Sequence, residues 1–456
     1  MGILHRYESF LTSLPEVERP RVAMTFKNKI KWTGIIIITY LVMTNIMLYG
    51  LDHSRAINYF GPMQTILASK FGTLITLGIG PIVTGSIILQ ILVGGKLIDL
   101  DMENPVDKEI YQGTQKMLSL GFTVFEAGIM VMMGALPAQG NDPFLKFIII
   151  AQLVVAGALI IYMDEVVSRW GFGSGIGLFI VAGVAEQIVY RSIAPIKIGQ
   201  QYAGIILNTF NQVLFNGGGM NILFDLTPLL GTIIVFLFVV YVESMRIEIP
   251  LTYGKFRGAR GRYPIKFIYA SNIPVIFASI LMANVQLWAR LLQNLGHPLL
   301  GTVGTGGPGT YTGIVKYFSY PTPIYSAGFN PIHAIIFTII LIILSVIFSI
   351  FWVETSGMNA KTVAKQLHSG GMQIPGFRGD IRIIERVLQR HIPAVTVLGG
   401  AAVGLLAAFG DVTGALGGGT GVLLTVGILY QMYESMAKEQ LFDLHPMMRK
   451  ILGDII

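Results

Sequence analysis

Residues 173 to 183 read GSGIGLFIVAG, and residues 417 to 427 read GGGTGVLLTVG. The two segments align without gaps and share glycine at Gly173/Gly417, Gly175/Gly419, Gly177/Gly421 and Gly183/Gly427. A second ungapped pair joins PIVTGSIIL at 81 to 89 with PVIFASILM at 274 to 282. Glycine-rich apolar helices can match by chance, and for either pair alone that alternative is equally open. Because both pairs have the same offset when counted in apolar spans, we favour an internal repeat.

The composition predicts a membrane protein. Hydrophobic residues make up 53% of the 456 residues and charged residues only 12%, too few to cover a water-exposed globule. The chain has no cysteine, which excludes disulfides, Cys-ligated metal sites and thiol catalysis. Ten apolar runs approach the length of about 20 residues that crosses a bilayer as a helix. They lie near 33–50, 73–94, 117–136, 144–163, 173–190, 227–243, 267–289, 332–353, 392–410 and 420–436.

The repeat predicts how these spans are arranged. Its two pairs fall in spans 2 and 7 and in spans 5 and 10, so the chain divides into two halves of five spans. Because five is odd, the second half enters the membrane from the opposite face, and such inverted repeats place a functional pathway between the halves. We therefore expect an all-α polytopic membrane protein of ten transmembrane helices in two inverted five-helix halves.

Basic residues predict the orientation. With a cytoplasmic N-terminus, most of the 32 Lys and Arg residues lie in cytoplasmic segments, as the positive-inside rule requires. The exceptions are Arg55, Lys70, Lys146, Arg191, Lys197, Arg290 and Lys316. Both termini are therefore expected in the cytoplasm. An apolar stripe before Pro15 predicts an amphipathic helix on the membrane surface, made by Ile3, Leu4, Tyr7, Phe10, Leu11 and Leu14.

Two further segments are apolar or glycine-rich without spanning. Residues 57 to 71, INYFGPMQTILASKF, are too short to cross and suit a re-entrant helix, which membranes tolerate only inside protein or along a cavity. Periodicity alone favours the alternative, an ordinary surface helix in an external loop. Residues 301 to 313, GTVGTGGPGTYTG, are not a phosphate-binding loop, because no Lys-Ser/Thr follows and no strand precedes.

Intramembrane polar residues are sparse. Glu126 in span 3 is the one deep carboxylate, and Thr84 and Asn284 are plausible polar companions in spans 2 and 7. An ionisable residue inside a bilayer is a functional candidate by default. A single carboxylate, however, gives little support for a proton relay. The seven His residues are dispersed without metal-ligand spacing. We find no catalytic constellation, and we expect neither an enzyme nor a cofactor.

Two cytoplasmic loops are strongly basic. Residues 246 to 266 read RIEIPLTYGKFRGARGRYPIK, and a helix through Arg382, Arg386 and Arg390 would present one basic face. Such surfaces suit the phosphates of ribosomal RNA or of lipid headgroups. That these charges only orient the chain is an equally open alternative. Both loops, however, are longer than orientation requires.

Several motifs carry a family resemblance across nearly the whole chain. They are GTLITLGIGPIVTGSIILQ (72–90), YMDEVVSRWGFGSGIGLFI (162–180), RIEIPL (246–251) with GRYPIKFIYASNIPVI (261–276), ANVQLW (283–288), FWVETSG (351–357) and GALGGGTGVLL (414–424). In these motifs the sequence resembles the SecY family, the channel-forming alpha subunit of the protein translocon, in its archaeal form. The resemblance implies a ten-helix clamshell with an hourglass pore between its halves.

The resemblance also implies an apolar ring and a plug that close the pore. The implied ring residues are Ile79, Val83, Phe172, Ile176, Ile276 and Leu424. Phe172 replaces the usual aliphatic residue, so either the waist is tighter or this side chain is displaced from it. The plug maps onto about 61–71, which reverses the surface-helix interpretation; its named residues are Gly61, Pro62, Gln64, Thr65, Ile66, Leu67 and Lys70.

A lateral gate and a docking surface follow from the same resemblance. The gate is implied between spans 2 and 3 and spans 7 and 8, with Thr84, Glu126 and Asn284 as its polar cluster. Docking of the ribosome is implied for Lys255, Arg257, Arg260, Arg262, Arg378 and Arg382. Other implied partners are a SecE-type gamma subunit, a small beta subunit, signal sequences, nascent chains and membrane lipid.

The expected function is passage of unfolded secretory polypeptides across the cell (plasma) membrane, with signal or transmembrane segments released laterally into lipid. No nucleotide site is recognisable, so a partner must supply the energy. A secondary transporter, the main competitor, should carry more intramembrane ionisable groups. The glycine-rich openings of spans 5 and 10 disfavour a scaffold or insertase without a pore.

The expected domain boundaries follow the spans. They are an N-terminal segment (1–31), a first half (32–195), an external connection (196–226), a second half (227–437) with cytoplasmic loops 245–266 and 354–391, and a cytoplasmic tail (438–456).

Overall fold

The computed structural model describes most of the chain. The described residues are 15–22, 24–56, 64, 66–95, 97, 98, 100, 104–198, 201–215, 221–253, 260–270, 272–302, 311–326, 328–373 and 380–444. The predicted amphipathic helix before Pro15 lies outside them. The residues that follow it are bound to two helices of the first half: the Lys116 ammonium donates to the Pro15 carbonyl at 2.5 Å, and the Trp170 indole N–H donates to the Glu18 carbonyl at 2.8 Å.

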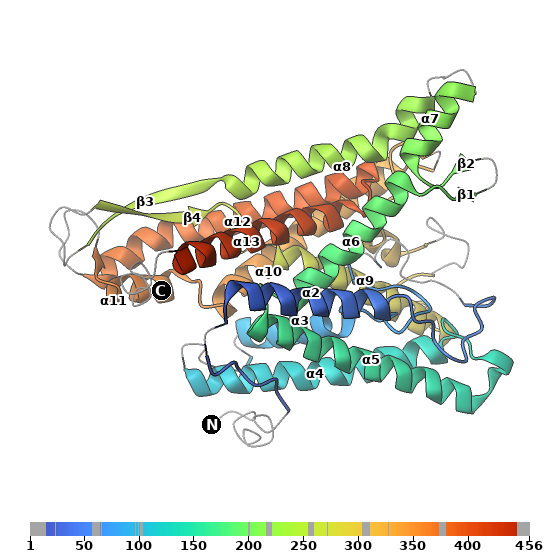
Figure 1. Cartoon of the computed structure of the whole chain (residues 1–456), viewed down its shortest axis with the longest axis horizontal. Coiled ribbons are helices and arrows are strands. Elements are labelled where there is room, and N and C mark those ends of the chain that lie inside the picture. The colour runs from blue at the N-terminus through green and yellow to red at the C-terminus, as the bar shows by residue number, and fades with distance from the viewer. Residues whose placement is uncertain are drawn as a thin grey trace.

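Long helices dominate both halves (Figure 1). The first half contains α2 (Phe26–Met43), α3 (Gly80–Gly94), α4 (Pro105–Met132), α5 (Pro143–Trp170) and α6 (Gly175–Ile193). The second half contains α8 (Asn221–Ser244), α9 (Ile273–Asn294), α10 (Pro331–Thr355), α12 (Ile381–Thr413) and α13 (Gly419–Leu444). Each predicted span overlaps one of these helices. Within the described residues, six helices are long and apolar enough to cross a membrane.

The smaller elements lie between these helices. They are η3 (Gln139–Asn141), β1 (Lys197–Ile198), β2 (Gln201–Tyr202), α7 (Ile205–Phe215), β3 (Arg246–Tyr253), β4 (Arg260–Lys266), η4 (Ile314–Phe318), α11 (Ala360–Ser369) and β5 (Met372–Gln373). Figure 1 places β3, β4 and α11 at one end of the molecule and β1, β2 and α7 at the other. The longer strands β3 and β4 therefore lie at the opposite end of the molecule from the short strands β1 and β2.

The two repeat pairs begin helices at equivalent positions. α3 begins at Gly80 and α9 at Ile273, in each case one residue before the aligned prolines Pro81 and Pro274. Proline suits the start of a helix because its missing N–H is not needed there. α6 and α13 begin at the aligned pair Gly175 and Gly419. The similarity between the repeat segments therefore extends from sequence to helix boundaries.

One predicted span is only partly helical. Residues 73 to 79 were expected to open span 2, but they form turns, and α3 begins at Gly80. Gly78 has φ +57°, and a Cβ there would lie 2.0 Å from the Leu67 carbonyl oxygen. The helix prediction is therefore wrong over 73–79. This stretch approaches segment 66–69 too closely for a regular helix with side chains, and an apolar run does not reveal such a contact.

The predicted cytoplasmic loop 245–266 is largely a β-hairpin. β3 pairs antiparallel with β4 from Arg246↔Lys266 to Thr252↔Arg260, and its far end pairs with β5. The loop 354–391 contains α11 and the first turns of α12. Arg382, Arg386 and Arg390 therefore lie on one continuous helix that also contains the ninth predicted span. The sequence interpretation had assigned no strand to either loop.

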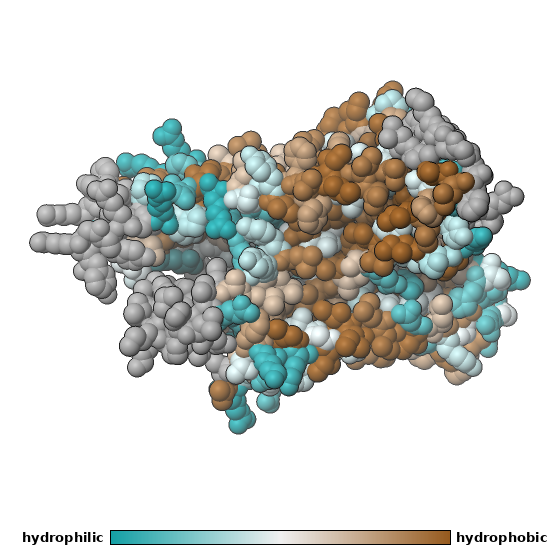
Figure 2. Space-filling view, turned by 45° about the horizontal axis from the view of Figure 1, so that its top comes forward, coloured by the Kyte–Doolittle hydropathy of each residue, from teal (hydrophilic) through white to brown (hydrophobic). Residues whose placement is uncertain are grey.

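The largest apolar core joins the two halves. It includes Ile79 and Phe179 from the first half and Ile276, Phe348 and Leu424 from the second. Large apolar side chains also cover the outside; Figure 2 shows them as a broad brown band across the middle of one face, with hydrophilic side chains toward both ends. Exposed apolar surface of this extent is expected where lipid is the solvent. The chain is a multi-pass membrane protein.

Candidate functional site

A cavity of about 460 Å³ lies between the two halves. Its walls come from α3, α4 and α6 of the first half and from α9, α10 and α13 of the second. The lining is mainly apolar, with polar side chains that include Ser86, Gln90, Gln115 and Asn272. The interface predicted by the repeat to hold a pathway thus contains a cavity.

The predicted ring residues gather at this cavity. Val83, Phe172, Ile176 and Ile276 line it. Ile79 and Leu424 are each 0% exposed, and with Val83 and Ile276 they belong to the core cluster that joins the halves. Ile176 packs against the same cluster. Side chains from both halves therefore form one continuous apolar contact beside the cavity.

Phe172 is tied to α2 as well as lining the cavity. Its backbone N–H donates to the Thr33 hydroxyl at 3.0 Å. Its ring meets Phe26 edge to face with centroids 5.3 Å apart, and the Lys29 ammonium lies 5.5 Å from its centroid. Aromatic and cation–π contacts of this geometry favour an aromatic residue over an aliphatic one. These contacts give a physical reason for the departure noted in the sequence.

The structure brings the predicted polar gate residues together. The Asn284 amide on α9 donates to the Thr84 hydroxyl on α3 at 3.0 Å. That hydroxyl approaches a Glu126 carboxylate oxygen on α4 at 3.2 Å and the Gly80 carbonyl at 2.8 Å. All three side chains are buried. One connected polar group therefore joins α3 and α4 to α9 across the boundary between the halves.

A second polar contact between the halves was missed by the sequence interpretation. The Gln90 amide on α3 donates to the Thr355 hydroxyl on α10 at 3.1 Å, and both side chains are buried. The Thr355 hydroxyl in turn donates to the Phe351 carbonyl at 2.9 Å, which orients its oxygen as an acceptor for Gln90. Both residues lie inside motifs already recognised, Gln90 in the C-terminal part of α3 and Thr355 at the end of α10. A polar residue in the C-terminal part of each of two facing helices was the available signal.

Residues 66–68 of the predicted plug are buried. Ile66 and Leu67 belong to the core cluster, and the Leu67 carbonyl accepts the Ile79 N–H at 2.8 Å. Lys70 forms an ion pair with Glu186 of α6 at 3.2 Å, and Gln64 is also described. The burial of Ile66 and Leu67 excludes an exposed surface helix at these two residues. Gly61, Pro62 and Thr65 lie outside the described residues.

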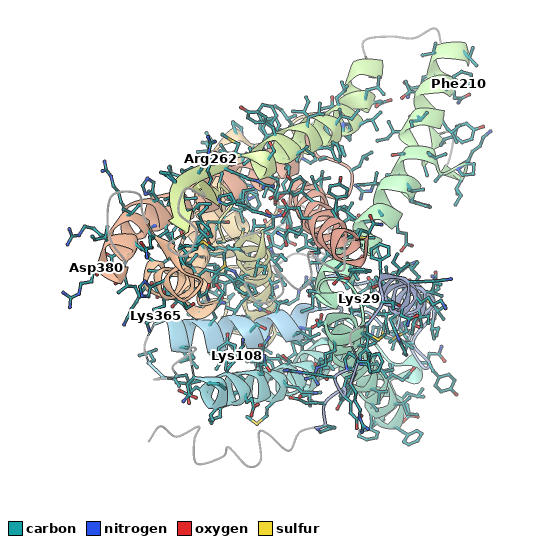
Figure 3. The ribbon with its side chains drawn as sticks, turned by 60° about the vertical axis from the view of Figure 1, so that its left-hand side comes forward. Lys29, Lys108, Phe210, Arg262, Lys365 and Asp380 are labelled. Atoms are coloured by element: carbon teal, nitrogen blue, oxygen red, sulfur yellow. The ribbon has the colours of Figure 1, made fainter. Side chains whose placement is uncertain are left out.

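The basic candidates divide into described and undescribed residues. The Arg262 side chain on β4 is 76% exposed and pairs with Glu248, and Arg382 is exposed in the first turn of α12. Figure 3 shows Arg262, Lys365 and Asp380 on neighbouring elements, β4, α11 and the start of α12. Lys255, Arg257 and Arg378 lie outside the described residues, as does the side chain of Arg260.

Two family models match this chain. A model described as SecY matches residues 73–433, and one described as the plug domain of Sec61p matches residues 38–72. The chain belongs to the SecY family. The plug-domain match covers most of the stretch from α2 to the buried segment that precedes α3.

Full-length relatives agree with this assignment. The chain is 47% identical to the protein translocase subunit SecY of Methanothermobacter thermautotrophicus, over 98% of this chain and 99% of the relative. It is also 47% identical to SecY of Methanocaldococcus jannaschii, over 97% and 98% of the two chains. The resemblance to archaeal members of the SecY family is confirmed.

Solved structures agree on the fold. A structure of a protein conducting channel aligns with TM-score 0.85 and 46% identity over 96% of this chain and 98% of that chain. Sec61 in a canine ribosome-channel complex aligns with TM-score 0.81 and 44% identity over the same shares. The predicted ten-span clamshell of the SecY family is confirmed.

Proposed function

We propose that this chain is the central pore-forming subunit of a protein-conducting channel that passes unfolded secretory polypeptides across the membrane. One observation carries the proposal: the cavity lies between the two halves, and apolar side chains from both halves line it and pack in the core cluster beside it. A relative is a protein translocase subunit SecY, and a solved structure with the same fold is that of a protein conducting channel. A pathway at this interface suits a substrate that must cross the whole membrane.

The apolar cluster gives the pore its seal. A narrow apolar constriction excludes water and therefore ions when it is empty. Val83, Ile176 and Ile276 would supply this constriction, because they face the cavity from three different helices. Aliphatic side chains can also surround a passing polypeptide without requiring particular hydrogen bonds. The constriction is thus compatible with many client sequences.

The polar contacts between the halves support a lateral gate. An apolar residue of a signal segment gains roughly 0.3–0.6 kcal/mol at the centre of a membrane helix, so about ten of them gain several kcal/mol. Hydrogen bonds between membrane helices contribute about 0.6–2 kcal/mol each. The bonds from Asn284 to Thr84 and from Gln90 to Thr355 would therefore set a threshold that a sufficiently apolar segment overcomes.

The proposed channel requires partners for docking, assembly and driving force. The exposed basic residues on β4 and α12 support docking to ribosomal RNA phosphates, with Lys255, Arg257, Arg260 and Arg378 as further candidates. A SecE-type gamma subunit and a small beta subunit would cover part of the apolar exterior. A ribosome or another partner would supply the driving force. We place the protein in the cell membrane with both termini cytoplasmic, because the segments that carry most of the Lys and Arg residues then face the cytoplasm.

The proposed domains keep the expected boundaries. Residues 32–195 would form the first half with the plug at about 61–71, and residues 227–437 the second half. The external connection would be 196–226, which contains β1, β2 and α7. The repeat supports this division, because α3 in the first half corresponds to α9 in the second, and α6 corresponds to α13.

The channel function is tested by reconstitution. The chain is purified with its small partner subunits, placed in liposomes and supplied with ribosomes that translate a signal-bearing precursor. Precursor that becomes protected from added protease, only when the channel is present, is the expected result. Absence of protection, together with uptake of a small solute coupled to an ion gradient, would instead favour a secondary transporter.

The docking surface gives a separate prediction. Replacing Arg262 and Arg382 with glutamate should lower the affinity for ribosomes about tenfold and flatten its salt dependence, because contacts to phosphates are lost. Cosedimentation of ribosomes with the reconstituted channel across a salt series measures both effects. Arg55→Glu is the matched control, since its side chain is 79% exposed on a segment assigned to the opposite face. Equal losses in the control and the double variant would contradict a specific docking site.

A further inference from the structure

Segment 66–69 is held by two consecutive carbonyl groups that bind different elements. The Leu67 carbonyl accepts the N–H of Ile79, the residue just before α3, at 2.8 Å. The next carbonyl, that of Ala68, accepts the Tyr40 hydroxyl of α2, also at 2.8 Å. The segment is therefore fastened to two separate transmembrane helices through main-chain atoms, which any side-chain sequence in the segment would still present.

The Tyr40 hydroxyl is fixed in position by its surroundings. Tyr40 is only 2% exposed. Its ring stacks on Phe179 of α6, with centroids 4.8 Å apart and planes 19° apart. A phenol has a single O–H donor, and here the Ala68 carbonyl receives it. Loss of this contact would leave a buried donor without that partner, so the bond favours the position of the segment seen here.

Ala68 holds a conformation that alanine disfavours. Its φ is +47°, in the left-handed region that glycine adopts freely and that other L-residues rarely adopt. The carbonyls on either side of this bend point to α2 and to the start of α3. The two hydrogen bonds therefore act against backbone strain at Ala68. If one bond breaks, relief of the strain favours movement of the segment away from its site.

The same segment touches the ring and the gate. Ile79, whose N–H binds Leu67, is a proposed ring residue. At Gly80 a Cβ would lie 3.4 Å from a Leu67 methyl carbon and 3.4 Å from a Glu126 carboxylate oxygen. Leu67 and Glu126 therefore meet at this glycine. Movement of α4 away from α3 would remove a wall of the site that holds Leu67.

We propose that Tyr40 is a latch, a positioning residue that holds segment 66–69 in the closed pore, and that strain at Ala68 makes the closed position easy to leave. The inference rests on the proposed function, in which this segment belongs to the plug. Tyr40 would act through the plug and would not need to contact the translocating chain. A latch of one hydroxyl can hold an empty channel shut and still yield when a client separates the helices.

Two substitutions should change the latch in opposite directions. Tyr40→Phe keeps the ring stacked on Phe179 and removes only the hydroxyl, so the segment should open about fivefold more often. Ala68→Gly keeps the carbonyl and relieves the strain, so opening should become about threefold rarer, although glycine also adds freedom to the released segment. Hydrogen exchange at the Ile79 amide reports this opening, because its N–H is bonded to the Leu67 carbonyl of the segment.

The experiment uses the channel assembled with its partner subunits in lipid nanodiscs. Tyr269→Phe is the matched control: its hydroxyl donates to the Met358 carbonyl at 2.7 Å, in a separate apolar cluster at the β3–β4 end. We expect the control to leave exchange at Ile79 unchanged. A global loss of stability would instead speed exchange throughout α2 and α6, so exchange in these helices is measured alongside and should stay at the parental rate.

Each result separates the latch from the channel function. Parental exchange in Tyr40→Phe, or faster exchange in Ala68→Gly, would overturn the latch. If both respond as expected while no variant conducts ions or translocates a precursor, the hold of Tyr40 on segment 66–69 is supported and the pore function is contradicted. If serine at Ile176 and Ile276 makes the channel leak but the Tyr40 and Ala68 variants keep parental exchange, the pore function stands and the latch falls.

Discussion

Serine in place of both Ile176 and Ile276 should raise the ion conductance of the resting channel by on the order of tenfold or more. Each isoleucine presents apolar surface to the cavity, one from α6 and one from α9. Burying such a side chain is favourable by roughly 1.5–3 kcal/mol, and about 1.4 kcal/mol corresponds to a tenfold change in an equilibrium. Hydroxyl groups at both positions lower the cost of wetting the constriction, so water and ions enter more often.

Planar bilayers containing the reconstituted channel complex provide the measurement, without ribosomes or precursor. Ile339→Ser is the matched control, because Ile339 on α10 is 50% exposed on the apolar exterior. The same chemical change there should leave conductance at the parental level. Thermal unfolding of each variant checks that the fold is intact. Parental conductance in the double variant would show that this cluster does not seal the pore.

Much of the transmembrane arrangement was predictable from sequence because lipid imposes a simple rule on it. Backbone groups in hydrocarbon must bond within a helix, so long apolar runs report helices directly. The glycine pairs Gly175/Gly419 and the prolines Pro81/Pro274 then mark equivalent helix starts. The scarcity of polar groups in the spans singled out Glu126, Thr84 and Asn284, which the structure joins.

The features that sequence did not reveal depend on contacts between distant segments. Residues 73 to 79 are as apolar as a helix, yet the approach of the Leu67 carbonyl to Gly78 prevents one there. The Gln90–Thr355 bond requires the C-terminal parts of α3 and α10 to lie side by side, which neither segment reports alone. In β3, by contrast, Ile247, Ile249 and Leu251 alternate with Glu248, Pro250 and Thr252, the pattern of a strand. This alternation predicts a strand, whereas the interpretation of the segment as a basic loop included none.

Asn284→Ala should lower the hydrophobicity that a signal segment needs for insertion. The substitution removes the bond from α9 to Thr84 on α3 and leaves a small gap at the closed interface. Loss of about 0.6–2 kcal/mol of gate stabilisation, divided by roughly 0.3–0.6 kcal/mol for each apolar residue, corresponds to about one to seven leucines. A precursor series with increasing numbers of leucine in its signal segment measures the threshold, as the number at which half of the precursor inserts.

Thr355→Val provides the companion variant because valine keeps the shape and removes the hydroxyl that accepts the Gln90 amide. Thr84 and Gln90 are six positions apart on α3, about 9 Å along the helix axis, and their polar partners are separate. Contacts at that separation usually contribute additively, so the double variant should shift the threshold by the sum of the two single shifts. Thr338→Val is the control on α10, since that hydroxyl bonds only to the Ala334 carbonyl of its own helix among the contacts described.

The direction and the sum of these shifts discriminate between two kinds of gate. A higher threshold in Asn284→Ala would mean that the amide stabilises the open gate more than the closed one, which contradicts a role in holding the halves together. A double variant that shifts no further than either single variant would mean that loss of one contact already releases the other. Additive lowering would mean that the two contacts stabilise the closed gate independently. Each contact would then add only its own hydrogen bond to the free energy that a segment must supply to separate α3 from the second half.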